Sequence, residues 1–216
     1  MYRPTGSWVA IPTPYDSDDK IDFGGFRTLI DHHIAHGTSE LFVMGSAGES
    51  TLLTTEERYE IVRQVVKMSK GRIPVFFGAT FPATADTVKF AQFAEAEGAD
   101  GLIFTVSPYL LPPQMAVLEQ LRTCMGAVKV PVGIYNNPSR LGINVEVDTI
   151  VTLAHEFPNF IVDKEAMPNV KQLVGVKRRL GERLNLLCCD FPQYAIVLPT
   201  LAAGGNGTAN IGGNVI

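Results

Sequence analysis

Short apolar runs recur eight times along the 216 residues, and the stretches between them are longer and more polar. The first seven runs are mostly apolar at consecutive positions, which is typical of a strand buried on both faces of a parallel sheet, and the last run is weaker. Parallel strands need a long crossover between them, so this repetition constrains the fold more than any other feature. The runs cover residues 8–11, 41–44, 75–77, 102–106, 132–135, 160–162, 186–189 and 207–211.

The stretches between the runs have apolar residues at helical spacing. One begins after Thr54, with Glu56 and Glu57 in its first turn, which is the pattern of a capped helix. Helices are predicted over residues 23–35, 55–68, 83–96, 114–125, 148–156, 169–180 and 193–202. Strands that alternate with helices predict an α/β fold with right-handed crossovers, and eight such strands predict a TIM (β/α)8 barrel.

No linker and no shift in composition divides the chain, so residues 1–216 are predicted to form one (β/α)8-barrel domain. The sequence ends at Ile216, shortly after the last apolar run, and no stretch for an eighth helix follows. We therefore expect a barrel that is truncated after its eighth strand, with the C-terminal helix or helices missing from this chain.

The composition argues against several classes of function. Hydrophobic residues make up 46% and charged residues 19% of the chain, and the net charge is −4. Neither a nucleic acid nor an anionic membrane is therefore expected as a partner. No apolar run reaches the roughly 18 residues of a membrane span, and the N-terminus lacks the apolar core of a signal peptide. We expect a cytoplasmic protein.

The cysteines and histidines carry no metal or disulfide pattern. Cys124, Cys188 and Cys189 are an odd set with an adjacent pair, which predicts buried thiols in a reducing compartment. The histidines of the first predicted helix lack the glutamate of the zinc-protease motif, so they are interpreted as surface or core residues. These histidines are His32, His33 and His36. No metal, nucleotide or redox cofactor is implied.

One lysine has a position suited to covalent chemistry. Active sites of such barrels lie at the C-terminal ends of the strands, and Lys164 follows the sixth apolar run. A lysine that is partly desolvated in a barrel mouth loses its preference for the ammonium form and becomes nucleophilic toward a carbonyl. The alternative from position alone is a solvated loop lysine beside Glu165.

Other polar side chains follow neighbouring runs. Tyr135 ends the fifth run and could move protons, and Arg140 a few residues later could hold a carboxylate with two hydrogen bonds. Ser46 lies in a turn of small residues whose backbone N–H groups could bind an anion. Tyr109 follows the fourth run. Each also has an alternative without a function. Tyr135 could be a tyrosine at the barrel rim and Arg140 a surface arginine. The segment around Ser46 could be an ordinary turn, and Tyr109 could be an interface or core aromatic.

A glycine-rich segment, residues 204–207, precedes the eighth run. Phosphate-binding loops of many barrels lie near strands seven and eight, but after a strand rather than before it. We therefore interpret these glycines as positions of close backbone packing at the bottom of the barrel.

Four separated motifs occur together and in order. They are residues 45–50 (GSAGES), 107–109 (SPY), 135–140 (YNNPSR) and 164–166 (KEA). Each lies at the predicted end of a strand, and together they resemble the dihydrodipicolinate synthase/N-acetylneuraminate lyase family over essentially the whole chain. The resemblance implies a class I aldolase, in which a lysine forms a Schiff base with a 2-oxo acid such as pyruvate.

The resemblance also implies roles for individual residues. Lys164 is expected to be the Schiff-base lysine and Tyr135 the proton-transfer residue, with Ser46 and Tyr109 completing a hydroxyl relay. The backbone N–H groups of Ser46 and Ala47 are expected to bind the carboxylate of the 2-oxo acid. Arg140 is expected to bind the carboxylate of the second substrate. A homo-oligomer, dimer or tetramer, is implied, in which Tyr109 reaches across a dimer interface.

The sequence therefore predicts a lyase that condenses or cleaves pyruvate with an aldehyde, as in the dihydrodipicolinate synthase branch. Two alternatives stay within the family: a dehydratase of 2-keto-3-deoxy sugar acids and another pyruvate aldolase. A third is a non-catalytic paralogue that binds a 2-oxo acid, motivated by Ala47, which stands where the family commonly has a second hydroxyl residue. Asp163 also departs from the family, which has an apolar residue there; strand alternation predicts that it points away from Lys164.

Overall fold

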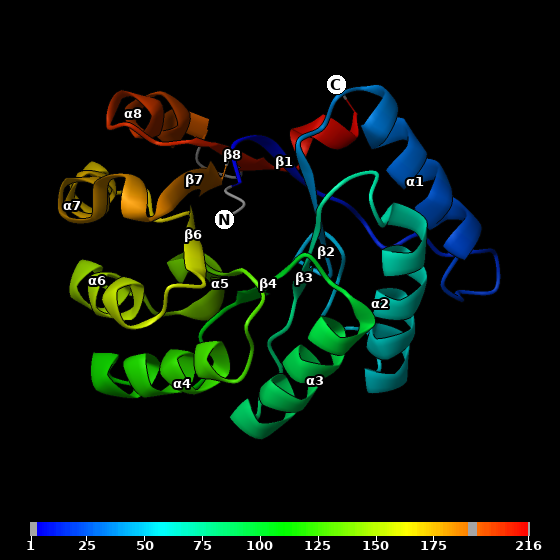
Figure 1. Ribbon diagram of the computed structural model, residues 1–216, viewed down its shortest axis with the longest axis horizontal. Helices are drawn as coiled ribbons and strands as arrows, with labels where there is room; N and C mark the ends of the chain where they lie inside the picture. The colour runs from blue at the N-terminus through cyan, green and yellow to red at the C-terminus, as the bar shows by residue number, and fades with distance from the viewer. Residues whose placement is uncertain (1–3, 190–193, 216) are drawn as a thin grey trace.

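The computed structural model describes residues 4–189 and 194–215. In this part of the chain eight parallel strands pair in sequence order, and β8 pairs with β1, so the sheet is a closed barrel. Figure 1 shows the helices arranged around it. The predicted TIM barrel is confirmed. The strands are β1 (Gly6–Ala10), β2 (Glu40–Val43), β3 (Val75–Gly78), β4 (Gly101–Phe104), β5 (Val132–Asn136), β6 (Phe160–Glu165), β7 (Asn185–Cys189) and β8 (Gly207–Asn210).

Six of the seven predicted helices agree with the structure to within a residue or two, whereas the last, predicted over residues 193–202, begins as an α-helix only at Val197. The helices are α1 (Phe23–Ala35), α2 (Thr55–Ser69), α3 (Thr84–Glu97), α4 (Gln114–Gly126), α5 (Pro138–Leu141), α6 (Val147–Glu156), α7 (Val170–Leu180) and α8 (Val197–Ala202). Short 3-10 turns are η1 (Gly181–Arg183), η2 (Tyr194–Ile196) and η3 (Gly212–Asn214). The predicted start of the last helix, Gln193, lies outside the described residues.

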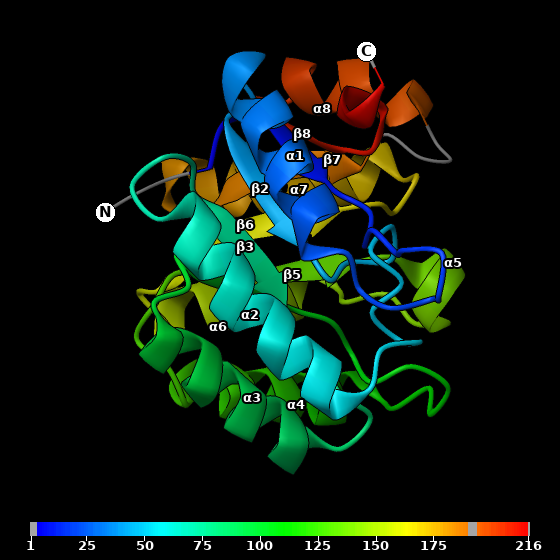
Figure 2. The ribbon, with the colours of Figure 1, turned by 90° about the vertical axis from the view of Figure 1, so that its right-hand side faces the viewer.

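The chain after the fifth strand forms the short helix α5. Pro138 occupies its first turn, where a proline needs no hydrogen-bond partner, and Gly142 ends it in the left-handed conformation. Figure 2 shows α5 beyond the end of the barrel, apart from the ring of covering helices. Residues that follow β5 are thereby held at the mouth of the barrel.

Two apolar layers hold the barrel together. The interior is filled by side chains such as Trp8, Phe42, Phe76 and Ile103, and the rings of Trp8 and Phe76 meet edge to face at 5.1 Å. A larger layer lies between the strands and the helices. Because successive strand residues point to opposite layers, both faces of every strand are buried, and this is why the strands are apolar at consecutive positions.

Strand β6 breaks this alternation. Its pairing with β5 shifts by one residue, so that Val132 is opposite Phe160 but Gly133 is opposite Val162. Ile161 and Val162 consequently both face the interior layer. Such a one-residue bulge reverses the facing of every residue that follows it. The predicted end of this strand at Val162 is wrong, since β6 continues to Glu165 and contains Lys164.

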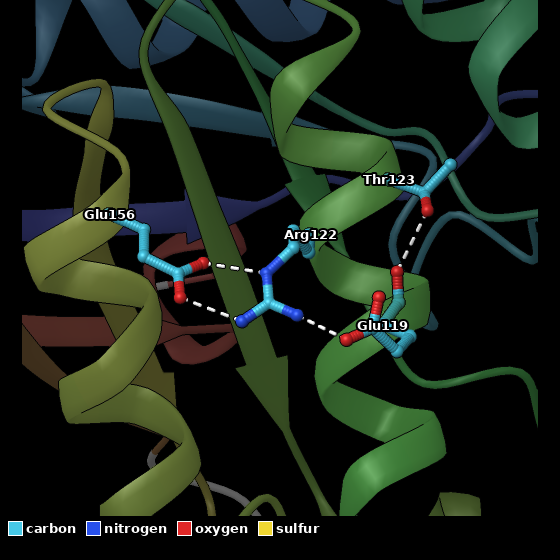
Figure 3. A network of polar contacts seen from close by, with 4 residues as sticks. All are labelled: Glu119, Arg122, Thr123 and Glu156. Carbon is cyan, nitrogen blue, oxygen red and sulfur yellow. Dashed lines mark hydrogen bonds and ion pairs between the residues drawn. The ribbon is translucent and has the colours of Figure 1, made fainter.

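Polar contacts link the covering helices. Thr54 and Glu57 form the capping box of α2, as the sequence pattern indicates. On the outside of the barrel, Arg122 of α4 donates two hydrogen bonds of 2.7 Å to Glu156 of α6 and also contacts Glu119 (Figure 3). These side chains are partly exposed, so the ion pair adds little to the stability of the fold.

Three smaller predictions, on the cysteines, the histidines and the glycine-rich segment, are confirmed. All three cysteines are buried. His33 is buried and its ring contacts Thr38, whereas His32 of α1 and His36, which follows the helix, are exposed. A Cβ on Gly207 would lie 2.2 Å from the carbonyl oxygen of Gly6, so the glycine-rich segment permits close packing of β8 on β1. Among the described residues, the helices are too short or too polar to cross a membrane.

Candidate active site

Lys164 lies inside the barrel, where only 3% of its surface is exposed. Its Nζ is 4.4 Å from the centre of the Tyr135 ring and 4.7 Å from the centre of the Phe42 ring. Lys164 and Tyr135 are directly opposite each other in the pairing of β6 with β5. The amine therefore faces the interior of the barrel, and the alternative of a solvated loop lysine is wrong.

The phenol of Tyr135 is held from two sides. Asn137 Nδ2 donates a hydrogen bond of 2.6 Å to its Oη, and Cys189 Sγ lies 3.7 Å away. Burial, followed by the neighbouring Cys189, raises the pKa of Tyr135 to about 12. The phenol consequently keeps its proton near neutral pH. Because Asn137 occupies one lone pair of Oη as a donor, the phenolic proton is available to another group.

The turn between β2 and α2 brings Ser46 and Ala47 to the mouth of the barrel. Met44 has a φ of 56°, which is uncommon for a residue with a side chain. A Cβ on Gly78 would lie 2.1 Å from the Met44 carbonyl oxygen, so glycine is required for β3 to approach this turn. Ser46 is exposed, while Ala47 is half-buried against the interior side chains.

A cavity of about 560 Å³ opens at this end of the barrel. Ser46, Tyr135 and Arg140 line it, and so does the Phe42 ring that contacts the lysine. Hydroxyl groups border much of the rest, from Ser50, Thr51, Thr54, Thr55, Thr80 and Thr105. The volume is in the range of small-molecule sites. Ser46 and Tyr135 line the same cavity but are not hydrogen-bonded to each other in the described part of the chain.

The cavity does not gather every candidate. Arg140 is exposed on α5 at its edge. Tyr109 is 93% exposed, with a φ of 80°, and is not among the described residues that line the cavity of its own chain. Its neighbours Leu110 and Leu111 are exposed as well. The expected hydroxyl relay through Tyr109 is therefore not formed within one chain.

The structure adds three residues that the sequence did not single out. Asn137 and Cys189 contact the phenol of Tyr135. Arg58 lines the cavity from α2, donating to the carbonyl oxygens of Gly78 and Thr80 and stacking 3.7 Å above the Phe81 ring. Burial lowers the pKa of Arg58 to about 10. Cys189 could have been found from its position at a strand end, whereas nothing in the local sequence distinguishes Arg58.

Two carboxyl groups flank Lys164 on the opposite face of β6. Asp163 is fully buried, and within the described residues neither of its oxygens has a hydrogen-bond partner. Burial and the nearby Glu165 raise its pKa well above the ordinary value. Asp163 points away from the lysine, as alternation predicts, and its burial without a partner disfavours the charged form of its carboxyl group.

Comparison with known proteins is consistent with this geometry. Residues 3–216 match the model of the dihydrodipicolinate synthetase family. The chain belongs to the dihydrodipicolinate synthetase family. Over 211 residues it is 35% identical to the 4-hydroxy-tetrahydrodipicolinate synthase of Aquifex aeolicus, covering 98% of this chain and 70% of the relative.

Solved structures of dihydrodipicolinate synthases have the same barrel. The enzyme from Aquifex aeolicus has a TM-score of 0.93 at 35% identity, covering 98% of this chain and 71% of that chain. The chloride-inhibited enzyme from Acinetobacter baumannii, complexed with pyruvate, has a TM-score of 0.91 at 26% identity, again covering 98% and 71%. Membership of the dihydrodipicolinate synthetase family confirms the predicted class I, Schiff-base lyase.

Proposed function

We propose that Lys164 forms a Schiff base with pyruvate and that the resulting enamine adds to an aldehyde. The observation that carries the proposal is the buried amine of Lys164, 4.4 Å from the ring of Tyr135, which lines a cavity of about 560 Å³. A relative with 26% identity was solved in complex with pyruvate, which supports the choice of 2-oxo acid.

The chemistry follows from the groups around the amine. The Nζ of Lys164 adds to the C2 carbonyl of pyruvate, and the carbonyl oxygen leaves as water to give an imine. Tyr135 is the proton donor to that leaving oxygen, because its raised pKa keeps the phenol protonated. The phenolate of Tyr135 then takes a C3 proton, which gives an enamine. The enamine C3 forms a bond to the aldehyde carbon, whose oxygen takes that proton back from Tyr135. Water then hydrolyses the imine, which returns a proton to Tyr135 and restores the amine.

Two groups at the mouth are suited to carboxylates. The backbone N–H groups of Ser46 and Ala47 form the proposed site for the pyruvate carboxylate, and the loss of a side-chain hydroxyl at Ala47 does not remove that backbone donor. Arg140, at the edge of the cavity, is the proposed partner for a carboxylate on the aldehyde substrate. This assignment favours a synthase with a carboxylated aldehyde.

The relay from Tyr135 is proposed to continue through Ser46 and then through Tyr109 of a second copy of the chain. Support comes from the exposed loop that contains Tyr109, Leu110 and Leu111, because such a contiguous apolar surface favours a protein contact. The proposed active form is therefore a homo-oligomer.

Borohydride reduction in the presence of pyruvate tests the Schiff base directly. We expect a reduced pyruvate adduct on Lys164, located by peptide mass, and no adduct in Lys164→Ala. Lys177 is a matched control, since it is also a buried lysine but lies on α7, with its Nζ 3.0 Å from the Gly181 carbonyl oxygen. Lys177→Ala should be labelled as the unaltered protein is. An adduct on another lysine, or none on the folded protein, would overturn the proposal.

A further inference from the structure

A buried hydrogen-bond network lies directly behind the wall of the barrel. Asn136 Nδ2 donates to Glu165 Oε2 at 3.0 Å and to Asn144 Oδ1 at 2.8 Å. Gln172 Nε2 of α7 donates to the same Glu165 oxygen at 3.1 Å and to the Val145 carbonyl oxygen at 2.9 Å. Asn136 and Glu165 are completely buried, and Gln172 is 7% exposed.

This network begins one residue after each of the two proposed catalytic groups. Asn136 follows Tyr135 and Glu165 follows Lys164, and the two pairs are consecutive steps of the ladder between β5 and β6. The backbone closes the arrangement, since Ala166 N donates to the Asn136 carbonyl oxygen at 2.9 Å. The second Glu165 oxygen accepts from Met167 N at 2.6 Å.

The bulge in β6 explains why such a network is needed. Ile161 and Val162 both face the interior, so the regular alternation of inward and outward side chains is broken at Val162. Hydrophobic burial alone therefore does not fix the register of the residues that follow. A slip of β6 by one residue would move Glu165 away from Asn136 and Gln172. It would leave a buried carboxyl group and two amides without partners, which costs about 1–3 kcal/mol for each group.

We propose that Glu165, Asn136 and Gln172 are positioning residues that lock β5 and β6 in the register in which Lys164 and Tyr135 face each other. This inference rests on the proposed function and deepens it. None of the three side chains lines the cavity among its described residues. They act on the reaction only through the two strand residues that precede Asn136 and Glu165.

Gln172→Ala is the informative variant, because it removes one of the hydrogen bonds to Glu165 without altering either strand. We expect the rate of borohydride-trapped imine formation at saturating pyruvate to fall roughly 10- to 100-fold, as small misplacements of reacting groups do. The pyruvate concentration that gives half the maximal rate should change by less than about threefold, since the proposed carboxylate donors are on another turn. Gln172→Met, which keeps the volume, replaces the alanine variant if that one does not fold.

Asn159→Ala is the matched control. Asn159 Nδ2 also ties backbone segments together, donating to the Val128 and Val130 carbonyl oxygens at 3.0 and 3.3 Å, but at the opposite end of β6. Asn159→Ala should lower the urea concentration at the unfolding midpoint while leaving the trapping rate unchanged. If Gln172→Ala lowers the stability of the protein but leaves the trapping rate unchanged, as expected for Asn159→Ala, the positioning role is refuted and the proposed Schiff base is unaffected. If the unaltered protein itself gives no adduct, the proposed function fails instead.

Discussion

The thiol of Cys189 lies 3.7 Å from the phenol oxygen of Tyr135, inside the barrel. After burial, this neighbour is the next largest cause of the raised pKa of Tyr135. Cys189→Ala should therefore lower the pKa of Tyr135, although burial will keep it above the ordinary value. We expect the alkaline limb of imine formation to move to lower pH. A phenolate absorbance titration, with Tyr135→Phe as the reference, measures the change in the pKa of Tyr135. An alkaline limb at the same pH in Cys189→Ala would contradict the prediction.

Removing the phenol itself should slow proton transfer. Tyr135→Phe keeps the ring against Lys164 but deletes the oxygen that Asn137 contacts. We expect imine formation to slow by roughly 10²- to 10⁴-fold, while long incubation with pyruvate and borohydride still labels Lys164. Stopped-flow or quenched trapping measures the rate. A rate equal to that of the unaltered protein would remove Tyr135 from the proposed mechanism.

The two proposed carboxylate sites can be separated by variants of Arg140. Loss of a charge-assisted hydrogen bond costs about 1.5–3 kcal/mol, so Arg140→Ala should raise the KM for a carboxylated aldehyde roughly 10- to 100-fold. Imine trapping with pyruvate should stay within about twofold. Arg140→Lys should recover only part of the loss, because a lysine cannot make the paired contact. Equal effects on both substrates would argue against the assignment.

Asp163 should make the protein less stable as the pH rises. Its pKa in the folded state is raised above the ordinary value of 3.8. The unfolded chain thus releases this proton first, and stability falls by about 1.4 kcal/mol per pH unit between the two pKa values. Below 3.8 both states are protonated and the penalty vanishes. Asp163→Asn should therefore unfold at higher urea concentration than the unaltered protein at neutral pH but not below pH 3.8.

The control for this variant is Asp148→Asn, since Asp148 has a side chain that is 86% exposed. Urea unfolding of both variants across the pH range gives the comparison. The interpretation fails if the curves of Asp163→Asn and of the unaltered protein run parallel from acid to neutral pH.

The barrel could be predicted because its strands are buried on both faces, which leaves apolar runs such as residues 41–44 that a simple pattern detects. The end of β6 could not be predicted in this way. Asp163, Lys164 and Glu165 are charged residue types that rarely lie in a core, so they indicate a loop. They are part of the strand because partners from β5 and α7, distant in the sequence, surround Glu165.

The candidate site divides in the same way. Tyr135 lies near the end of a strand, and Ser46 and Arg140 lie after strands, so all three could be predicted from the general position of barrel sites. The cavity brings them together. Arg58 could not be predicted from its helix, because the carbonyl oxygens that hold it belong to Gly78 and Thr80. Asn137 was part of a recognised motif, but its contact with the phenol depends on a strand end that only the three-dimensional structure defines.

The bulge at Ile161 sets a rule for how this strand can vary. Counting residues from Phe160 in regular alternation would turn Asp163 into the barrel and Lys164 out toward the helices; the extra residue reverses both. Side chains at this point can be exchanged for others of similar size, but deletion or insertion of a single residue would exchange an amine for a carboxyl at the centre of the barrel. Homologous chains that keep the chemistry should therefore tolerate substitutions between Phe160 and Lys164 but preserve the number of residues.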